Sequence, residues 1–245
     1  MNILAVIPAR YASQRFPGKP LAQLGDRPMI QWVYEAAKSC PGFDRVIVAT
    51  DSDMIADRVR SFGGEVELTH GDHSTGTDRV AEVAALHPEF QAIVNVQGDQ
   101  PFVTPKMLMQ LIEPYLQGQS PDMTTLACPL DATTGYGDPN TVKVLCDRRQ
   151  RALYFSRSAI PYFRNSVEAP VYHHLGLYAF RRDFLTAYAQ LTATPLEQCE
   201  ALEQLRVLEH GYSIRVCQTE KAVLEINTPE DLTKAQILIA EKVAS

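Results

Sequence analysis

The stretch ILAVIPARYASQRFPGKP, residues 3–20, joins a continuous apolar run to a loop with three cationic side chains. An unbroken apolar run of this kind is typical of a strand buried on both faces of a parallel sheet. The loop after it holds Arg10, Arg15 and Lys19 among proline and glycine residues. Ligands of open parallel sheets bind outside the carboxyl ends of the strands, which is where this loop begins. The stretch therefore predicts a buried first strand followed by a cationic binding loop.

Further apolar runs follow, and helical patterns separate them. The runs lie at Val46–Ala49 and Ala92–Val96, and amphipathic patterns cover Pro28–Ser39, Asp51–Arg60 and Thr77–Leu86. This alternation of strands and helices predicts a doubly wound sheet of the α/β class. No repeat or linker divides the chain, so we expect a single domain over residues 1–245.

The second half of the chain is richer in strand patterns. LACPL, VKVL, ALYF and HLGLYAF follow one another from Thr124 onward, and a helical pattern then covers Pro195–His210. We expect a sheet extension or a small subdomain around residues 124–210. IRVC is a further predicted strand, and a last helix is expected over Pro229–Val243, with Asn227 or Thr228 as its cap.

Composition narrows the class of partner. The net charge is −6, so the overall field disfavours nucleic acid and anionic membranes, and an anionic ligand needs a local cationic cluster. The five cysteines are scattered and include no C-x-x-C spacing, which argues against a disulfide framework or a structural zinc site and favours the cytoplasm. No apolar run approaches the length of a membrane span.

The cationic loop suits a chain of phosphates. Arg10, Arg15 and Lys19 can neutralise phosphate charge, and Gly18 lets the backbone approach and offer N–H donors. The loop matches neither the Walker A pattern nor G-x-G-x-x-G. The alternative interpretation is a solvated basic turn.

Two more loops carry candidate site residues. Asp99, in NVQGDQP, directly follows an apolar strand, where a carboxylate can hold Mg²⁺ together with phosphate oxygens; the alternative is a turn aspartate that bonds its own backbone. In HGDHSTGTDR, residues 70–79, Ser74, Thr75 and Thr77 either cap the following helix or contact a base or ribose.

Taken in chain order, the motifs resemble one enzyme family almost from end to end. They are IPARYASQRFPGKPL, ATDSD, STGTDR, NVQGDQP, ALYFSRSAIPY, HHLGLYAFRR, LEQLR and INTPEDL. This set resembles the 3-deoxy-manno-octulosonate cytidylyltransferase (CMP-Kdo synthetase) family; the first motif is shared with CMP-sialic acid synthetases. The resemblance implies a single nucleotide-diphosphosugar-transferase-like domain with three α/β/α layers and a mixed sheet. It also implies a homodimer that uses CTP and Mg²⁺.

The resemblance assigns roles on the nucleotide side residue by residue. It places the nucleotide-binding residues at Arg10, Ser13, Arg15, Lys19, Ser74, Gly76, Arg79 and Gln97. Within this set Arg10, Arg15 and Lys19 are expected to act in catalysis, together with Asp99 as the Mg²⁺ ligand.

The sugar-binding motifs fall mostly in the second half. They place the sugar contacts at Gln97, Arg157, His174, Tyr178, Glu203 and Gln204. Strand alternation puts His174, Gly176 and Tyr178 on one face and His173, Leu175, Leu177 and Ala179 on the other. We therefore expect the apolar face to pack and His174 and Tyr178 to face the site, although a lone strand histidine is more often structural.

A single helix over Pro195–His210 is expected to place Leu202, Leu205 and Leu208 on one face. The same helix is expected to place Glu200, Glu203, Gln204 and Val207 on another, from which Glu203 and Gln204 reach the ligand; a solvated face is the alternative.

One position departs from the family pattern. The second metal carboxylate of the family lies in a DTPEDL-like string, whereas this chain has Asn227, which can offer a metal only an uncharged oxygen. Two outcomes are open: a lower metal affinity, or compensation by Glu225 or a second phosphate contact. Gln100 stands where glutamate is frequent.

The implied reaction transfers CMP from CTP to the anomeric hydroxyl of 3-deoxy-D-manno-octulosonate (Kdo), releases pyrophosphate and feeds lipopolysaccharide or capsule synthesis. The alternatives are another acid sugar, such as 8-amino-Kdo or sialic acid, and a non-catalytic nucleotide-binding homologue.

Overall fold

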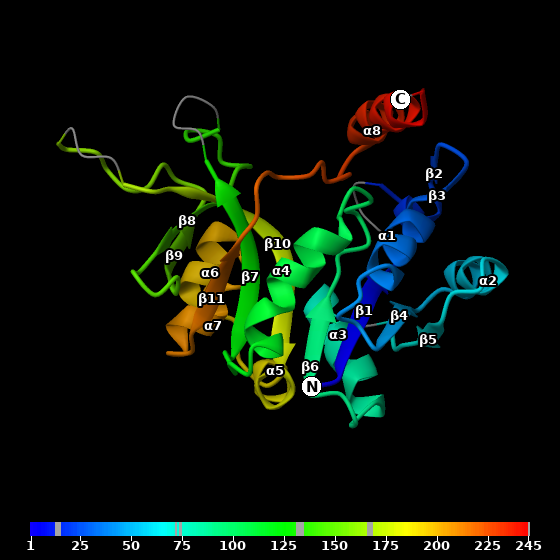
Figure 1. The fold of residues 1–245 in the computed structure, drawn as a ribbon, viewed down its shortest axis with the longest axis horizontal. Coiled ribbons are helices and arrows are strands. Elements are labelled where there is room, and N and C mark those ends of the chain that lie inside the picture. Colours follow the sequence, from blue (N-terminus) through cyan, green and yellow to red (C-terminus); the bar gives the residue numbers. More distant parts are fainter. Residues whose placement is uncertain (13–15, 72, 74, 131–134, 166–168, 245) are drawn as a thin grey trace. The chain divides into compact units, whose positions relative to one another are not determined.

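The computed structural model describes residues 1–12, 16–71, 73, 75–130, 135–165 and 169–244 (Figure 1). The chain divides into two compact units, residues 1–109 with 223–245, and residues 110–222. Both units combine strands and helices, so the expected α/β class is confirmed. The expectation of one domain over the whole chain stays a prediction.

The sheet of the first unit is parallel and contains the three apolar runs. β1 (Ile3–Ala9) lies between β4 (Arg45–Thr50) and β6 (Ala92–Asn95), and β4 also pairs with β5 (Val66–Leu68). The side chains from residue 3 to residue 7 are fully buried, as an unbroken apolar run predicts.

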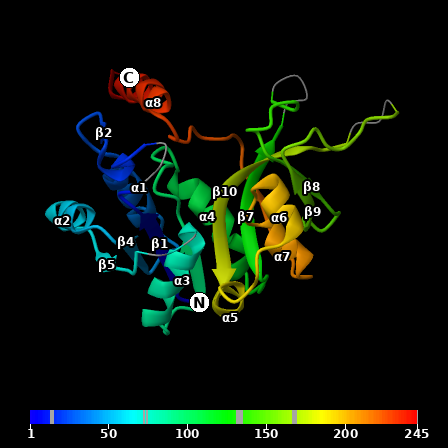
Figure 2. The ribbon, with the colours of Figure 1, turned by 180° about the vertical axis from the view of Figure 1, so that it is seen from behind.

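Three helices connect these strands and lie beside the sheet in the two opposite views of Figures 1 and 2. They are α1 (Met29–Lys38), α2 (Asp53–Ser61) and α3 (Gly76–Leu86). The buried residues of α1 recur every three or four positions, which is the amphipathic pattern of the sequence; they are Met29, Ile30, Val33, Tyr34 and Ala37. The predicted helices therefore form, with their ends shifted by one or two residues.

Short elements and the last helix complete the first unit. The 3-10 helix η1 (Lys19–Leu21) and the hairpin of β2 (Gln23–Leu24) and β3 (Arg27–Pro28) precede α1, and α8 (Pro229–Ala244) closes the chain. The cap of α8 is Thr228, because Asp231 N donates to Thr228 Oγ1 at 3.2 Å and Thr228 N donates to Asp231 Oδ2 at 3.0 Å.

The second unit has a mixed sheet. The chain enters this unit along α4 (Pro105–Leu116). β7 (Met123–Pro129) pairs in parallel with β11 (Ile214–Gln218) and antiparallel with β10 (Tyr172–Arg181). β8 (Lys143–Cys146) pairs with β10 and with β9 (Ala152–Ser156), and α5 (Arg182–Tyr188) follows β10. All strand patterns predicted from residue 124 onward are therefore strands.

The expected single helix over residues 195–210 is wrong. The segment forms α6 (Pro195–Glu200) and α7 (Leu205–Glu209), and between them Ala201 has a left-handed φ of 51°. A largely buried ion pair joins the two short helices, with Arg206 Nη2 lying 2.6 Å from Glu197 Oε1. Because the helix axis is interrupted, the predicted faces do not exist: Val207, assigned to the polar face, is fully buried.

The alternation in β10 is interrupted as well. Its register against β7 shifts between Leu175 and Tyr178, as in a β-bulge. His174, Leu175, Leu177 and Tyr178 are all buried, so both faces of the strand are covered here. Among the described residues, no helix is long and apolar enough to cross a membrane.

Candidate active site

The cationic loop and the aspartate after β6 meet in the first unit. Lys19 Nζ donates to Asp99 Oδ2 at 2.8 Å and to the carbonyl oxygen of Ile226 at 3.1 Å. The side chains of Lys19 and Asp99 keep 15% and 25% of their surface exposed. Gly18 turns the chain into η1 with a φ of 69°, a conformation that favours glycine, and its N–H donates to Tyr11 O at 2.9 Å. The contact between Lys19 and Asp99 is the one that the sheet topology predicts.

The ends of β1 and β6 bring these loops together because adjacent parallel strands end at the same edge of a sheet. A Cβ atom on Gly98 would lie 3.0 Å from the carbonyl oxygen of Pro8. The loop after β6 can therefore pack this closely against β1 only if position 98 is a glycine. A Cβ on Gly76, at the start of α3, would lie 3.3 Å from Pro8 Cγ and 3.8 Å from Gln97 Oε1. Gly76 and Gln97, both predicted to bind nucleotide, therefore lie close together.

The segment before α8 completes the group that we call the Lys19 cluster, defined as Lys19, Asp99, Glu225 and Asn227. Ile226 N donates to Asp99 O at 2.9 Å. Burial and the charge of Asp99 raise the pKa of Glu225, and hydrogen bonds from Gln100 and Asn227 and the charge of Lys19 act against this rise. Two carboxylates thus lie within electrostatic reach of each other.

The donor atoms of the Lys19 cluster suit a hard cation. Mg²⁺ is typically bound by one or two carboxylates together with phosphate oxygens and water. Asp99 and Glu225 supply carboxylates, and the Asn227 side chain contributes an amide that bonds Glu225. In the part of the chain that the structure describes, no group of three or more His, Cys, Asp or Glu side chains is placed to hold a metal by itself. The arrangement therefore fits a cation that is shared with a phosphate.

The remaining nucleotide-side candidates differ in their surroundings. Arg10 is exposed, and the structure gives it no partner among the described residues. Arg79 is 3% exposed; it donates to Asp51 Oδ2 at 3.0 Å and to Thr69 Oγ1. Ser13, Arg15 and Ser74 lie outside the described residues.

The helix cap of α3 is Thr75. Its Oγ1 accepts from Asp78 N at 3.1 Å, and its own N–H donates to Asp78 Oδ2 at 3.0 Å, a reciprocal capping box. Thr77 is buried and its hydroxyl accepts from Asn95 Nδ2 at 3.2 Å. The capping interpretation of this loop is therefore confirmed for Thr75.

In the second unit, four side chains form what we call the His174 cluster, defined as Thr125, His174, Tyr178 and Gln204. His174 Nε2 lies 2.9 Å from Thr125 Oγ1, and Tyr178 Oη donates to Gln204 Oε1 at 3.2 Å. The rings of His174 and Tyr178 stack with centroids 5.8 Å apart, so they share a face as predicted. Burial, with a smaller effect of His173, lowers the pKa of His174 to about 3, so its imidazole is neutral at pH 7.

Arg157 is held by backbone carbonyl groups. Its Nε donates to Glu200 O at 2.7 Å, its Nη1 to Pro139 O at 3.0 Å and its Nη2 to Ala201 O at 3.4 Å. The carboxylate of Glu200 accepts from Arg157 N at 2.9 Å. Glu203, in the same region, accepts from Tyr188 Oη at 3.4 Å.

Lys143 was not predicted to matter, and it is fully buried. Its Nζ donates to the carbonyl oxygens of Arg157 at 2.6 Å, Thr141 at 2.7 Å and Asp138 at 2.9 Å, and burial lowers its pKa. A lysine inside the string VKVL gives no local signal of this, because strand alternation favours an exposed position.

The chain belongs to the cytidylyltransferase family, whose model matches residues 4–219. It is 67% identical over 100% of both chains to 3-deoxy-manno-octulosonate cytidylyltransferase of Acaryochloris marina. It is 55% identical to the protein of the same name from Synechococcus elongatus, over 99% of this chain and 100% of that one.

Solved structures agree with this assignment. The structure of CMP:2-keto-3-deoxy-manno-octonic acid synthetase complexed with CTP matches with a TM-score of 0.94 and 41% identity, over 99% of this chain and 100% of that one. The 4-diphosphocytidyl-2C-methyl-D-erythritol synthase of Anaerococcus prevotii matches with a TM-score of 0.64 at 17% identity, over 98% of each chain, and supports the fold alone.

Proposed function

We propose that this cytidylyltransferase transfers CMP from CTP to the anomeric hydroxyl of Kdo and releases pyrophosphate. The observation that carries the proposal is the 2.8 Å contact between Lys19 and Asp99 at the carboxyl ends of β1 and β6. The relatives that match the whole chain bear the name of this activity.

The reaction brings two anions together, the sugar acid and the nucleotide. In the proposed mechanism the sugar hydroxyl attacks the α-phosphorus of CTP in line with the departing pyrophosphate. Lys19, Arg10 and Arg15 neutralise the phosphates and stabilise the charge that develops on them, and binding orients the reacting groups. The substrate supplies the nucleophile, so the chain needs no nucleophilic side chain.

We infer that Mg²⁺ is the cofactor and that Asp99 holds it, with Asn227 or Glu225 as the second protein group. A bound Mg²⁺ neutralises phosphate charge and fixes the geometry of the phosphates. In the proposed loaded state Lys19 leaves Asp99 and contacts phosphate. Glu225 supports this assignment, because the charge of Asp99 already acts on its carboxyl group and would be offset by a cation.

The remaining candidate residues are proposed to serve the base and the sugar. Ser13, Ser74, Gly76 and Arg79 belong to the nucleotide side, together with Gln97. The sugar-side residues are Gln97, Arg157, His174, Tyr178, Glu203 and Gln204. The neutral His174 suits hydrogen bonding to a hydroxyl group, and it is not placed to carry charge.

The assembly and the location are proposals of the same kind. We infer a homodimer that uses the strand-rich residues 124–180, and a cytoplasmic location where CTP is available. We expect no nucleic-acid partner and no insertion into a membrane, since the chain has a net charge of −6.

Pyrophosphate release tests the activity. The protein is mixed with CTP, Mg²⁺ and one sugar at a time: Kdo, 8-amino-Kdo or sialic acid. We expect release with Kdo that a chelator abolishes and that UTP does not support. Faster release with 8-amino-Kdo or sialic acid would show that this other sugar, and not Kdo, is the preferred substrate. The absence of release with all three sugars would favour a non-catalytic homologue, for which Asn227 is the suggestive feature.

A further inference from the structure

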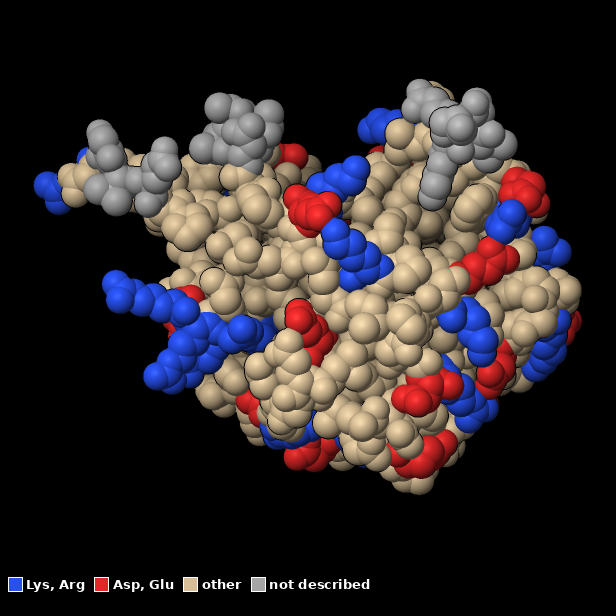
Figure 3. Space-filling model, viewed as in Figure 1, with Lys and Arg blue, Asp and Glu red and all other residues tan. Residues whose placement is uncertain are grey.

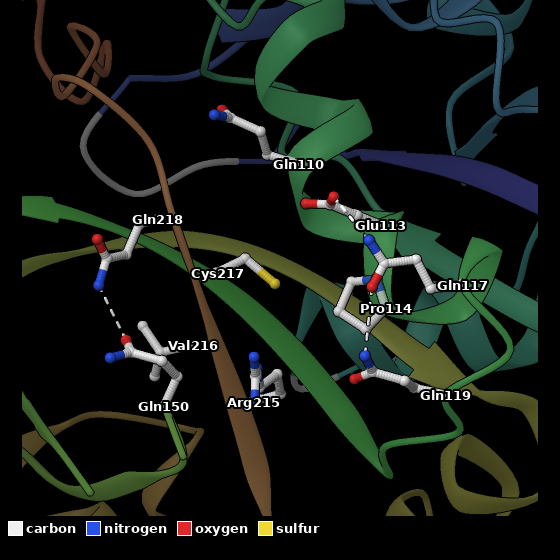
Figure 4. A pocket seen from close by; sticks show the side chains of 10 residues that line it. All are labelled: Gln110, Glu113, Pro114, Gln117, Gln119, Gln150, Arg215, Val216, Cys217 and Gln218. Carbon is white, nitrogen blue, oxygen red and sulfur yellow. Dashed lines mark hydrogen bonds between the residues drawn. The ribbon is translucent and has the colours of Figure 1, made fainter. Parts of the chain in front are cut away.

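A cavity of about 330 Å³ lies in the second unit, and its lining includes none of the residues proposed above for CTP, Mg²⁺ or Kdo. Figure 4 shows it between α4 on one side and, on the other, β11 and Gln150, which precedes β9. Its lining is polar and unusually rich in amides, with five glutamines beside one glutamate and one arginine. A volume of this size is in the range of small-molecule sites, which are about 300–1,000 Å³.

The wall formed by α4 offers acceptors. Pro114 lies inside this helix and has no N–H, so the carbonyl group of Gln110 cannot receive its helical hydrogen bond. The carboxylate of Glu113 lines the same wall and accepts from Gln117 Nε2 at 2.8 Å. This wall therefore suits a ligand group with several N–H donors.

The opposite wall offers donors. The guanidinium of Arg215 uses one N–H group on the carbonyl oxygen of Arg149, which leaves other N–H groups available. Gln150 accepts from Gln218 Nε2 at 2.9 Å through its oxygen, so its own amide N–H groups are available to a ligand. Blue side chains gather at this end of the molecule in Figure 3, and Arg148 and Arg149 are among the exposed residues. This wall suits an anionic group.

Cys217 lies between the two walls. Figure 4 shows its sulfur between the side chains of Glu113 and Arg215. Burial raises the pKa of this thiol to about 12, while Arg215 acts to lower it and Glu113 to raise it. Both charges therefore reach the sulfur, and the thiol stays neutral at pH 7. The Cys217 side chain is therefore an uncharged part of the cavity lining between the two opposite charges of Glu113 and Arg215.

We propose that this cavity binds a free α-amino acid, with its ammonium group at Glu113 and its carboxylate at Arg215. The ligand chemistry follows from the separation of charge: acceptors and a carboxylate on one wall, donors and a guanidinium on the other. A free amino acid carries both charges on one small molecule, whereas a sugar or an inorganic anion satisfies only one wall. The site is distinct from the proposed CTP and Kdo sites, and its test does not depend on the reaction.

The test is calorimetric titration of the full chain with L-alanine, L-glutamine and L-glutamate. Lactate lacks the ammonium group and alaninamide lacks the carboxylate, so we expect each to bind at least about tenfold more weakly than the corresponding amino acid. No saturable binding of any of the three amino acids would overturn the proposal. Equal binding of lactate, alaninamide or glycerol would overturn it as well.

Two substitutions locate the binding. Glu113→Gln and Arg215→Met should each weaken amino-acid binding by about tenfold or more, because each removes one ionic partner. Arg148→Met, at an exposed arginine outside the cavity lining, is the matched control and should leave the affinity unchanged. Arg215→Lys keeps the charge and should bind more tightly than Arg215→Met, provided that circular dichroism shows both to be folded. Binding that none of these substitutions alters would place the ligand elsewhere and refute the assignment.

Discussion

The Lys19 cluster and the His174 cluster differ in what their side chains already bind. In the first, Lys19 has one carboxylate and one carbonyl partner, and both charged side chains remain partly exposed. In the second, His174, Tyr178 and Gln204 are at most 7% exposed and bond to other side chains of the unit. The first cluster can exchange an internal partner for a ligand, whereas the second holds a defined shape. The difference suggests that one group of motif residues acts mainly through charge and the other through position.

The largest effect is expected at the Lys19 cluster. Lys19→Ala should slow pyrophosphate release from CTP by about a hundredfold or more, because it removes charge stabilisation at the phosphates. The free energy of unfolding should fall by only about 1 kcal/mol, because Asp99 loses its counterion but stays partly exposed to water. Steady-state kinetics and urea unfolding measure the two quantities, and Lys221→Ala, at an exposed lysine, is the control. Unchanged turnover would exclude a role for Lys19 on the transition state.

The opposite pattern is expected for the residues that hold the second unit in shape. Lys143→Met should lower the free energy of unfolding by about 3 kcal/mol, because three partly buried carbonyl groups lose the donor that the buried lysine supplies. Urea unfolding measures this loss, with Lys221→Met as the matched surface control. A loss no larger than that of the control would show that the buried lysine does not hold the loop.

The pH dependence of stability sharpens the same contrast. The pKa of His174 is about 3 in the folded protein, below the 6.5 of an exposed histidine, so between these values only the unfolded chain binds the proton. This site therefore makes stability fall with acidification by about 1.4 kcal/mol per pH unit across that window. His174→Gln should flatten the slope of unfolding free energy between pH 6 and pH 4, roughly within that window. An unchanged slope would mean that His174 is not buried as a neutral group.

The smallest effect concerns the uncharged member of the Lys19 cluster. Asn227→Asp should lower the Mg²⁺ concentration needed for half-maximal activity by roughly threefold or more, since it adds a carboxylate near Asp99. Asn227→Ala should raise that concentration, because it removes the amide that bonds Glu225. Titration of activity with Mg²⁺ gives both values. Identical Mg²⁺ requirements in all three proteins would remove Asn227 from the metal site and leave Glu225 as the candidate.

The first unit was predictable because its signals are local. Unbroken apolar runs identified β1, β4 and β6, and parallel pairing then required the loops after β1 and β6 to meet at one edge. The contact between Lys19 and Asp99 follows from that topology. The ion pair of Arg79 with Asp51 could not be predicted in this way. The two residues are 28 positions apart, and the sequence around either one gives no sign of the other.

The second unit resisted prediction for physical reasons that local periodicity does not contain. Ala201 adopts a left-handed conformation that alanine rarely takes, so nothing in the string LEQCEALEQLR marks the break between α6 and α7. The register shift in β10 likewise appears only when the strand is paired with β7. The role of Lys143 gives no local signal, because its three acceptors are backbone carbonyl oxygens of other residues, one of them 14 positions away.

The pairing of Lys19 with Asp99 has a thermodynamic consequence for ligand binding. A phosphate that takes Lys19 alone leaves the aspartate without a counterion, and a cation that takes Asp99 alone leaves the lysine without one. Either event costs free energy, because one charge of the pair is left without a counterion. This cost disappears when both ligands are present, since each charge then has a new partner. Under the proposed function, CTP and Mg²⁺ therefore bind with positive coupling, and by linkage each tightens the other by the same factor.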